Sequence, residues 1–190
     1  MAFALVVVGA SLGGLHALEI LLAGLTAHFP LPVAIGQHRR EDADDALCAA
    51  LRRRSALPVG EAQDKEAIVP GRVYVAPAGY HLLVEEGRFA LSTEAPVAYA
   101  RPSIDVLFES AAEVYETGVI GVILTGASKD GSQGAARIKV RGGFVVVQDP
   151  RTAEGSVMPE AAIAATDVDR ILPLAAIGPC EAALSRSGGR

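Results

Sequence analysis

Strand-like and helix-like stretches alternate along most of the 190 residues of this chain. Continuous apolar runs rich in β-branched residues, at 3–8 and 119–124, are typical of strands buried on both faces of a sheet. The first run is followed at 12–25 by leucines spaced three and four residues apart, which predicts a helix. Such an alternation predicts an α/β domain with a doubly wound, mostly parallel open sheet.

The middle of the chain departs from this alternation. Short β-rich runs at 81–84 and 88–92 are joined by Glu85-Glu86-Gly87, and an acidic turn ending in glycine is typical of a hairpin. We therefore expect an antiparallel hairpin, inserted at the edge of the parallel sheet over residues 80–92 or so.

The composition excludes several classes of protein. A net charge of −5 argues against a nucleic-acid binder, which would carry a basic face. No signal peptide and no apolar run of about 18 residues is present, so we expect a cytoplasmic protein without membrane insertion. No histidine or cysteine pair has metal-ligand spacing, so no metal is expected. Without linkers or repeats, residues 1–190 are predicted to form a single domain with a frayed tail at 185–190.

Polar side chains follow three of the predicted strands. Ser11 comes after the first strand, His38 after the second, and Asp130 lies a few residues beyond the strand that ends at Leu124. In open parallel sheets, ligands bind at the carboxyl ends of the strands. These three side chains are therefore candidates for a nucleophile, a base and an orienting carboxylate.

Ser11 lies in Gly9-Ala10-Ser11-Leu12-Gly13, which fits the pattern Gly-x-Ser-x-Gly. Small residues on both sides permit a tight strand-to-helix turn that exposes the serine hydroxyl. The backbone N–H groups of Leu12 and Gly13 would then lie at a helix start, where they can stabilise an oxyanion. Two other roles fit the same segment, because Ser11 could cap the helix or the helix end could bind phosphate.

Four histidines compete for the role of base. Only His38 stands directly after a buried parallel strand next to the Ser11 strand, whereas His16, His28 and His81 fit surface or structural positions.

Four aspartates are candidates for the orienting carboxylate: Asp130, Asp105, Asp149 and Asp167. Asp130 precedes a predicted helix and follows a glycine-bearing turn, which indicates a close approach of the backbone. Asp149 directly follows another predicted strand and is the rival to Asp130.

Several ordered segments carry a more specific signal. They are Gly9–Gly14, Gln37-His38, Tyr74–His81, Arg101–Phe108, Leu124-Thr125-Gly126 with Lys129-Asp130-Gly131, Gln148-Asp149-Pro150 and Met158–Ala162. In this order, from about residue 3 to 183, they resemble the catalytic domain of the chemotaxis-type protein-glutamate methylesterases.

This resemblance implies a Ser–His–Asp triad in which Ser11 is the nucleophile, His38 the base and Asp130 the orienting carboxylate. It implies hydrolysis of glutamate methyl esters, and often deamidation of glutamines, on chemoreceptors or related signalling proteins, without a cofactor. Members of the family commonly carry an N-terminal receiver domain. Since the first predicted strand begins at residue 3, we expect a stand-alone enzyme with a separate receiver or kinase as partner.

Two loops depart from the pattern of the family. Ala127-Ser128 stands where the family usually has Met-Gly, and Arg39-Arg40 where it usually has Met-Pro. The backbone N–H of Ala127 can still donate to an oxyanion, but apolar packing on the substrate is reduced. The double arginine adds cationic groups beside the base, which fits acidic helices of a receptor or a different substrate.

The changed loops leave two rival functions open. One is a catalytically weak or inactive binding module that keeps the fold with an altered substrate. The other is an NADP-binding reductase, because Gly9–Gly14 resembles a dinucleotide turn and Arg39-Arg40 could hold a 2′-phosphate. Ser11 argues against the reductase, since it occupies the position of the middle glycine in that turn.

Overall fold

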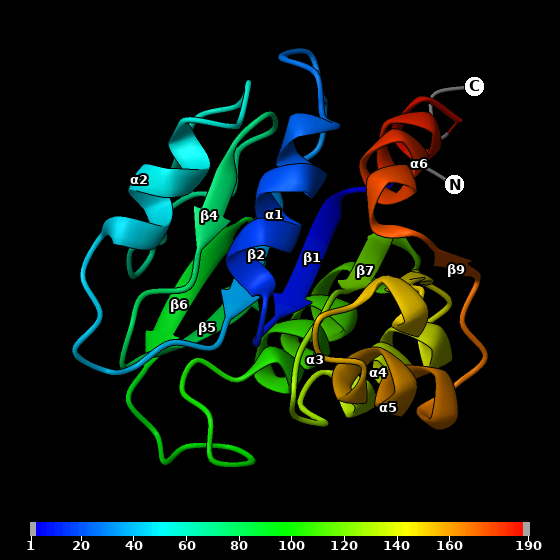
Figure 1. Cartoon of the computed structure of the whole chain (residues 1–190). Helices are drawn as coiled ribbons and strands as arrows, with labels where there is room; N and C mark the ends of the chain where they lie inside the picture. Colours follow the sequence, from blue (N-terminus) through cyan, green and yellow to red (C-terminus); the bar gives the residue numbers. More distant parts are fainter. Residues whose placement is uncertain (1–2, 188–190) are drawn as a thin grey trace.

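The computed structural model describes residues 3–187 and has a parallel sheet at its centre (Figure 1). Within those residues the sheet has seven strands in the order β3-β4-β2-β1-β7-β8-β9, and every neighbouring pair is parallel. The strands are β1 (Leu5–Ala10), β2 (Val33–Gln37), β3 (Val59–Glu61), β4 (Val73–Val75), β7 (Val119–Ile123), β8 (Phe144–Gln148) and β9 (Arg170–Leu172). The predicted doubly wound, mostly parallel sheet is confirmed.

Two layers of helices cover the sheet, because alternate side chains of each buried strand point to opposite faces. Val6 and Val8 of β1 pack on one side, and Leu5 and Val7 on the other. The first side is covered by α1 (Gly14–Ala23), α2 (Ala46–Arg52) and α6 (Leu174–Ser187). The second is covered by α3 (Ile104–Tyr115), α4 (Ser132–Val140) and α5 (Val157–Ala165). In the described part of the chain, no helix is both long and apolar enough to cross a bilayer.

The predicted antiparallel hairpin is present as β5 (His81–Glu85) and β6 (Arg88–Ser92). The predicted position at the edge of the parallel sheet is wrong, because the hairpin forms a separate two-stranded sheet. The reason is its apolar face: Leu82, Val84 and Phe89 are buried in the same core as α3. The hairpin therefore helps to hold α3 in place.

Other elements differ from the prediction. The strand β3 was not predicted, since three residues are too few for a periodic pattern. The helix α5 was not predicted because its many alanines give little contrast between an apolar and a polar face. Helix α6 continues through Ser187, so the predicted tail from 185 onwards is wrong as far as 187. The last predicted tail residues, 188–190, lie outside the described part.

The order of the strands places a switch point at β1. The chain leaves β1 for β2 on one side and later returns to β7 on the other side. The segments that follow these three strands meet at the carboxyl edge of the sheet, where α/β proteins bind their ligands. The candidate site lies at this edge.

Candidate active site

Ser11 lies in the turn between β1 and α1. Its backbone N–H donates to the carbonyl of Thr125 at 2.9 Å, and its carbonyl accepts from Gly14 at 2.8 Å. The first residue before the helix is Gly13, at φ 75°, and no side chain caps this helix. The Ser11 hydroxyl is half-buried and forms no hydrogen bond within residues 3–187. The alternative in which Ser11 serves as helix cap is therefore wrong, and its hydroxyl is free to react.

His38 and Asp130 form a direct pair. His38 Nε2 lies 2.7 Å from Asp130 Oδ2, and the Asp130 side chain is fully buried whereas the His38 side chain is 17% exposed. The rival Asp149 is paired instead with Arg151, from which it accepts both backbone and side-chain hydrogen bonds. The structure thus brings Asp130, and not Asp149, to the histidine.

The N-terminus of α3 surrounds the Asp130 carboxylate with donors. Oδ1 accepts from Ser103 Oγ and the Asp105 backbone N–H, both at 2.9 Å, and Oδ2 accepts from the Ile104 N–H at 2.7 Å. Burial raises the pKa of Asp130, but the hydrogen bonds from His38, Asp105, Ile104 and Ser103 outweigh burial and hold it below its usual range. The carboxylate therefore stays anionic at neutral pH and fixes a proton on His38 Nε2.

A second buried histidine supports this arrangement from behind. His81 is 2% exposed, and its Nδ1 accepts from the backbone N–H of Ser103 at 3.2 Å. Its Nε2 lies 3.1 Å from the carbonyl of Ala95, so the ring acts as a neutral bridge. This agrees with the structural role considered for His81 in the sequence. Ser103 was missed as a site residue, although a serine after proline and before an apolar helix is a recognisable N-cap signal.

Two further side chains tie the site segments together. Gln37 Nε2 donates to the carbonyls of Ser11 at 3.0 Å and His38 at 2.9 Å, which links the nucleophile segment to the base segment. Thr125 Oγ1 donates to the carbonyl of Leu12 at 2.9 Å and accepts from the N–H of Gly155 at 2.8 Å. Both residues lie in the segments that carry the family resemblance, but the sequence alone gave them no role.

Backbone donors are available beside Ser11. The N–H groups of Leu12, Gly13 and Ala127 donate no hydrogen bond to any described residue. Ala127 follows Gly126, whose Cα packs so closely on Met158 that a Cβ would lie 2.6 Å from Met158 Cε. This confirms the close backbone approach expected at the Thr125-Gly126 turn. The loop can present an N–H to an oxyanion at Ser11 because Thr125 is bonded to the Ser11 backbone.

The space beside Gly13, at the start of α1, is unfavourable for a bound dinucleotide. A Cβ on Gly13 would lie 2.6 Å from a carboxylate oxygen of Glu154. The Glu154 side chain thus fills the space beside Gly13 that the pyrophosphate of a dinucleotide needs at the first helix. This geometry disfavours both the reductase and the phosphate-binding alternatives.

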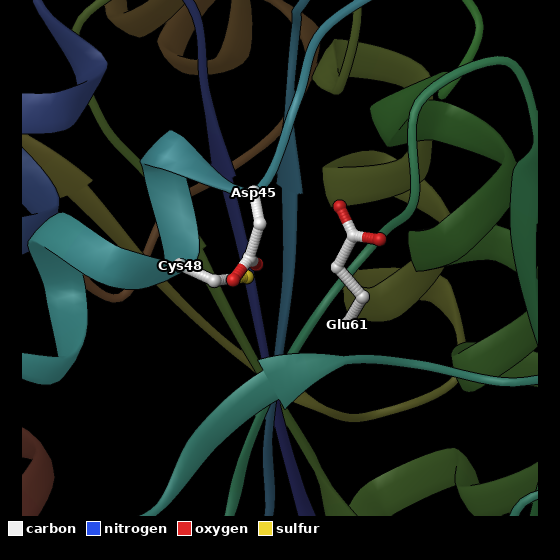
Figure 2. A group of neighbouring side chains, drawn as sticks. All are labelled: Asp45, Cys48 and Glu61. Carbon is white, nitrogen blue, oxygen red and sulfur yellow. The ribbon is translucent and has the colours of Figure 1, made fainter.

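Asp45, Cys48 and Glu61 form one further cluster of potential metal ligands in the described part, with their ligand atoms within 4.8 Å of one another. Figure 2 shows Asp45 and Cys48 close together at α2, with Glu61 entering from β3. Asp45 is paired with Arg52, and Glu61 with Arg39. Burial, with Asp45 and Glu61 nearby, raises the pKa of the Cys48 thiol to about 12. Guanidinium groups on both carboxylates and a protonated thiol favour a salt-bridged cluster over a cation site.

Comparisons with known proteins identify relatives of this chain. A protein of Leptospira interrogans is 47% identical over 175 residues, which cover 92% of this chain and 91% of the relative. The protein-glutamate methylesterase/protein-glutamine glutaminase 1 of Carboxydothermus hydrogenoformans is 44% identical over 179 residues. That alignment covers 91% of this chain and 53% of the relative, so the chain spans about half the length of that protein.

A solved structure and a family model lead to the same assignment. The catalytic domain of Thermotoga maritima CheB methylesterase superposes with a TM-score of 0.92 at 34% identity, covering 97% of this chain and all of that one. The family model described as CheB methylesterase matches residues 6–180. With that match over most of its length, the chain belongs to the CheB methylesterase family, a family of hydrolases.

Proposed function

We propose that this protein is a serine hydrolase that cleaves glutamate methyl esters, with Ser11 as nucleophile, His38 as general base and Asp130 as orienting carboxylate. The observation that carries the proposal is the 2.7 Å contact between His38 and the buried Asp130 at the switch point of the sheet. Ser11 follows the neighbouring strand and keeps a free hydroxyl.

The reaction begins with the transfer of the Ser11 hydroxyl proton to the unprotonated nitrogen of His38, Nδ1, since Nε2 is bonded to Asp130. Ser11 Oγ attacks the ester carbon, and the free N–H groups of Leu12, Gly13 and Ala127 stabilise the negative oxygen of the tetrahedral intermediate. The imidazolium then protonates the departing methoxide, which leaves as methanol. Water, deprotonated by His38, releases the glutamate and restores the Ser11 hydroxyl.

The same steps serve a glutamine side chain, with ammonia as the leaving group in place of methanol. The names of relatives support both reactions, because the Carboxydothermus hydrogenoformans protein is named for methylesterase and glutaminase activity. By the same relationship, we assign chemoreceptors or related signalling proteins as substrates, with a receiver or kinase protein as regulator.

Labelling with a fluorophosphonate tests the nucleophile directly. Such a probe phosphonylates an activated serine, so the wild-type protein gains the mass of one adduct, mapped by peptide sequencing to Ser11. Ser11→Ala and His38→Ala should give no adduct. Labelling that persists in Ser11→Ala would show that another residue reacts. A complete lack of labelling in the folded wild type would favour the inactive binding module.

A further inference from the structure

A cavity of about 320 Å³ opens beside His38. Its walls come from the double arginine after β2 and from the open loop between β6 and α3, which extends from the body of the molecule (Figure 1). Arg39, Arg40 and Arg101 line it, and among its described lining residues Glu41 carries the one negative charge. Three guanidinium groups thus line the cavity directly beside the proposed base.

Each of the three arginines is paired with a carboxylate of the chain, and two of them leave no buried donor unpaired among the described residues. Arg40 forms two hydrogen bonds with Asp42 at the surface, where 86% of the Arg40 side chain is exposed. Arg101 donates from Nη2 to Glu41 at 2.9 Å and from Nη1 to the carbonyl of Thr93. Neither arginine needs a further partner in the resting protein.

Arg39 differs from both. Its side chain is 8% exposed, and its Nη2 is held by Glu61. Its Nε and Nη1 are buried without a hydrogen-bond partner in the described part of the chain. Buried donors without a hydrogen-bond partner destabilise the folded protein, and a hydrogen bond to a bound acceptor would offset this cost. Arg39 also lines the cavity, so a small rotation of its guanidinium would present these two donors to an acceptor there.

We propose that this arginine cavity binds a free carboxylate of the substrate, supplied by an acidic side chain close to the ester. Guanidinium groups match carboxylates in both charge and geometry. Because the cavity shares His38 with the catalytic site, the side chain that enters it must lie near the reacting ester. On a helical substrate, side chains three or four positions apart are about 5–6 Å apart, so an acid at that spacing is suitably placed. This inference rests on the proposed function.

The wild-type protein provides the first test. Helical peptides carry one glutamate methyl ester and, three or four residues before or after it, either glutamate or glutamine. We expect kcat/KM for methanol release to be about tenfold higher with glutamate at the favoured position, the effect of one hydrogen bond to a charged group. High salt should reduce this preference. Ser11-dependent hydrolysis at equal rates would overturn the inference, whereas no Ser11-dependent hydrolysis of any peptide would overturn the proposed function instead.

Variants then assign the preference to one side chain. In Arg39→Met, which restores the residue type usual in the family, the ratio of the two kcat/KM values should fall toward one. Arg39→Lys should keep part of the ratio, because it keeps the charge. Arg54→Met is the matched control, since Arg54 is exposed in the turn after α2 and should leave the ratio intact. Thermal unfolding shows that each variant is folded. An unchanged ratio in folded Arg39→Met would contradict the assignment.

Discussion

The orientation of a single imidazole decides how the proposed site works. In the common serine-protease arrangement, Nδ1 faces the carboxylate and Nε2 faces the serine. Here Nε2 of His38 contacts Asp130, so the roles of the two ring nitrogens are exchanged. His38 stands at the end of β2, and Asp130 reaches the ring from beyond β7. In the proposed mechanism, Nδ1 of His38 is therefore the nitrogen that accepts the Ser11 proton.

Replacing Asp130 by asparagine tests its role. The amide presents an NH₂ group where the carboxylate now accepts from both His38 and the Ile104 N–H. The donor–donor contact favours the wrong tautomer of His38, so kcat should fall by roughly 10⁴-fold. Ester hydrolysis under saturating substrate measures the effect. Asp149→Asn is the control and should retain activity, because Asp149 is paired with Arg151 away from the site.

The effect of Asp130→Asn on the free energy of unfolding should depend on pH. Since the pKa of Asp130 is lower in the folded protein than its usual value of 3.8, its ionised form stabilises the fold above that value. The contribution is lost as the pH falls through the lowered pKa. The free energy of unfolding of the wild type should therefore exceed that of Asp130→Asn at pH 7, with a smaller difference in strong acid. A difference that grew on acidification would contradict the lowered pKa.

At the scale of elements, the N-terminus of α3 holds the Asp130 carboxylate, the proposed orienting group. The first turn of this helix contributes two backbone N–H groups to Asp130, and its cap residue Ser103 contributes a hydroxyl. A helix N-terminus favours negative charge, so the element is used as an anion site for an internal side chain. The hairpin fixes this helix end through His81, which accepts from the Ser103 N–H.

Ser103→Ala tests this use of the helix. The change removes the donor to Asp130 Oδ1 and also the cap that accepts from the Val106 N–H. We expect kcat to fall by about tenfold or more with little change in KM, because the loss acts through the position and charge of Asp130. Ser103→Thr keeps the hydroxyl and should restore most of kcat. Equal kcat values for the alanine variant and the wild type would rule out the positioning role.

The elements that could be predicted from the sequence are those with long or strongly apolar patterns. The strands β1, β7 and β8 are buried on both faces, which leaves a clear apolar run in the sequence. Short β3 has no such run, and the place of the hairpin depends on packing against α3 that no local pattern encodes. Positions after strands made His38 and Asp130 candidates, and the family resemblance selected the two together. The roles of Gln37 and Ser103 depend on tertiary contacts.

At the scale of the whole molecule, one buried acid links stability to pH. Glu181 in α6 is 1% exposed, and neither carboxylate oxygen has a hydrogen-bond partner within residues 3–187. Burial raises the pKa of Glu181 from 4.5 to about 8, so the neutral form is favoured in the fold. A raised pKa stabilises the fold below the usual pKa, and that stability is lost as the pH rises toward about 8.

Glu181→Gln should remove this dependence. Between pH 5 and 9, urea unfolding should show the variant gaining more than about 1 kcal/mol in free energy of unfolding relative to the wild type. Glu160→Gln provides the control, since Glu160 is exposed in α5 and its replacement should leave the curve parallel to that of the wild type. Parallel curves for Glu181→Gln and the wild type would contradict the raised pKa.

Ser11 is the proposed nucleophile for ester hydrolysis on glutamate side chains. Methanol release from a receptor cytoplasmic domain labelled in its glutamate methyl esters measures this reaction most directly. We predict steady release by the wild type, and loss of nearly all release in Ser11→Ala and His38→Ala, while both variants remain folded. Release that continues at the wild-type rate in Ser11→Ala, or no release by the folded wild type, would contradict the account.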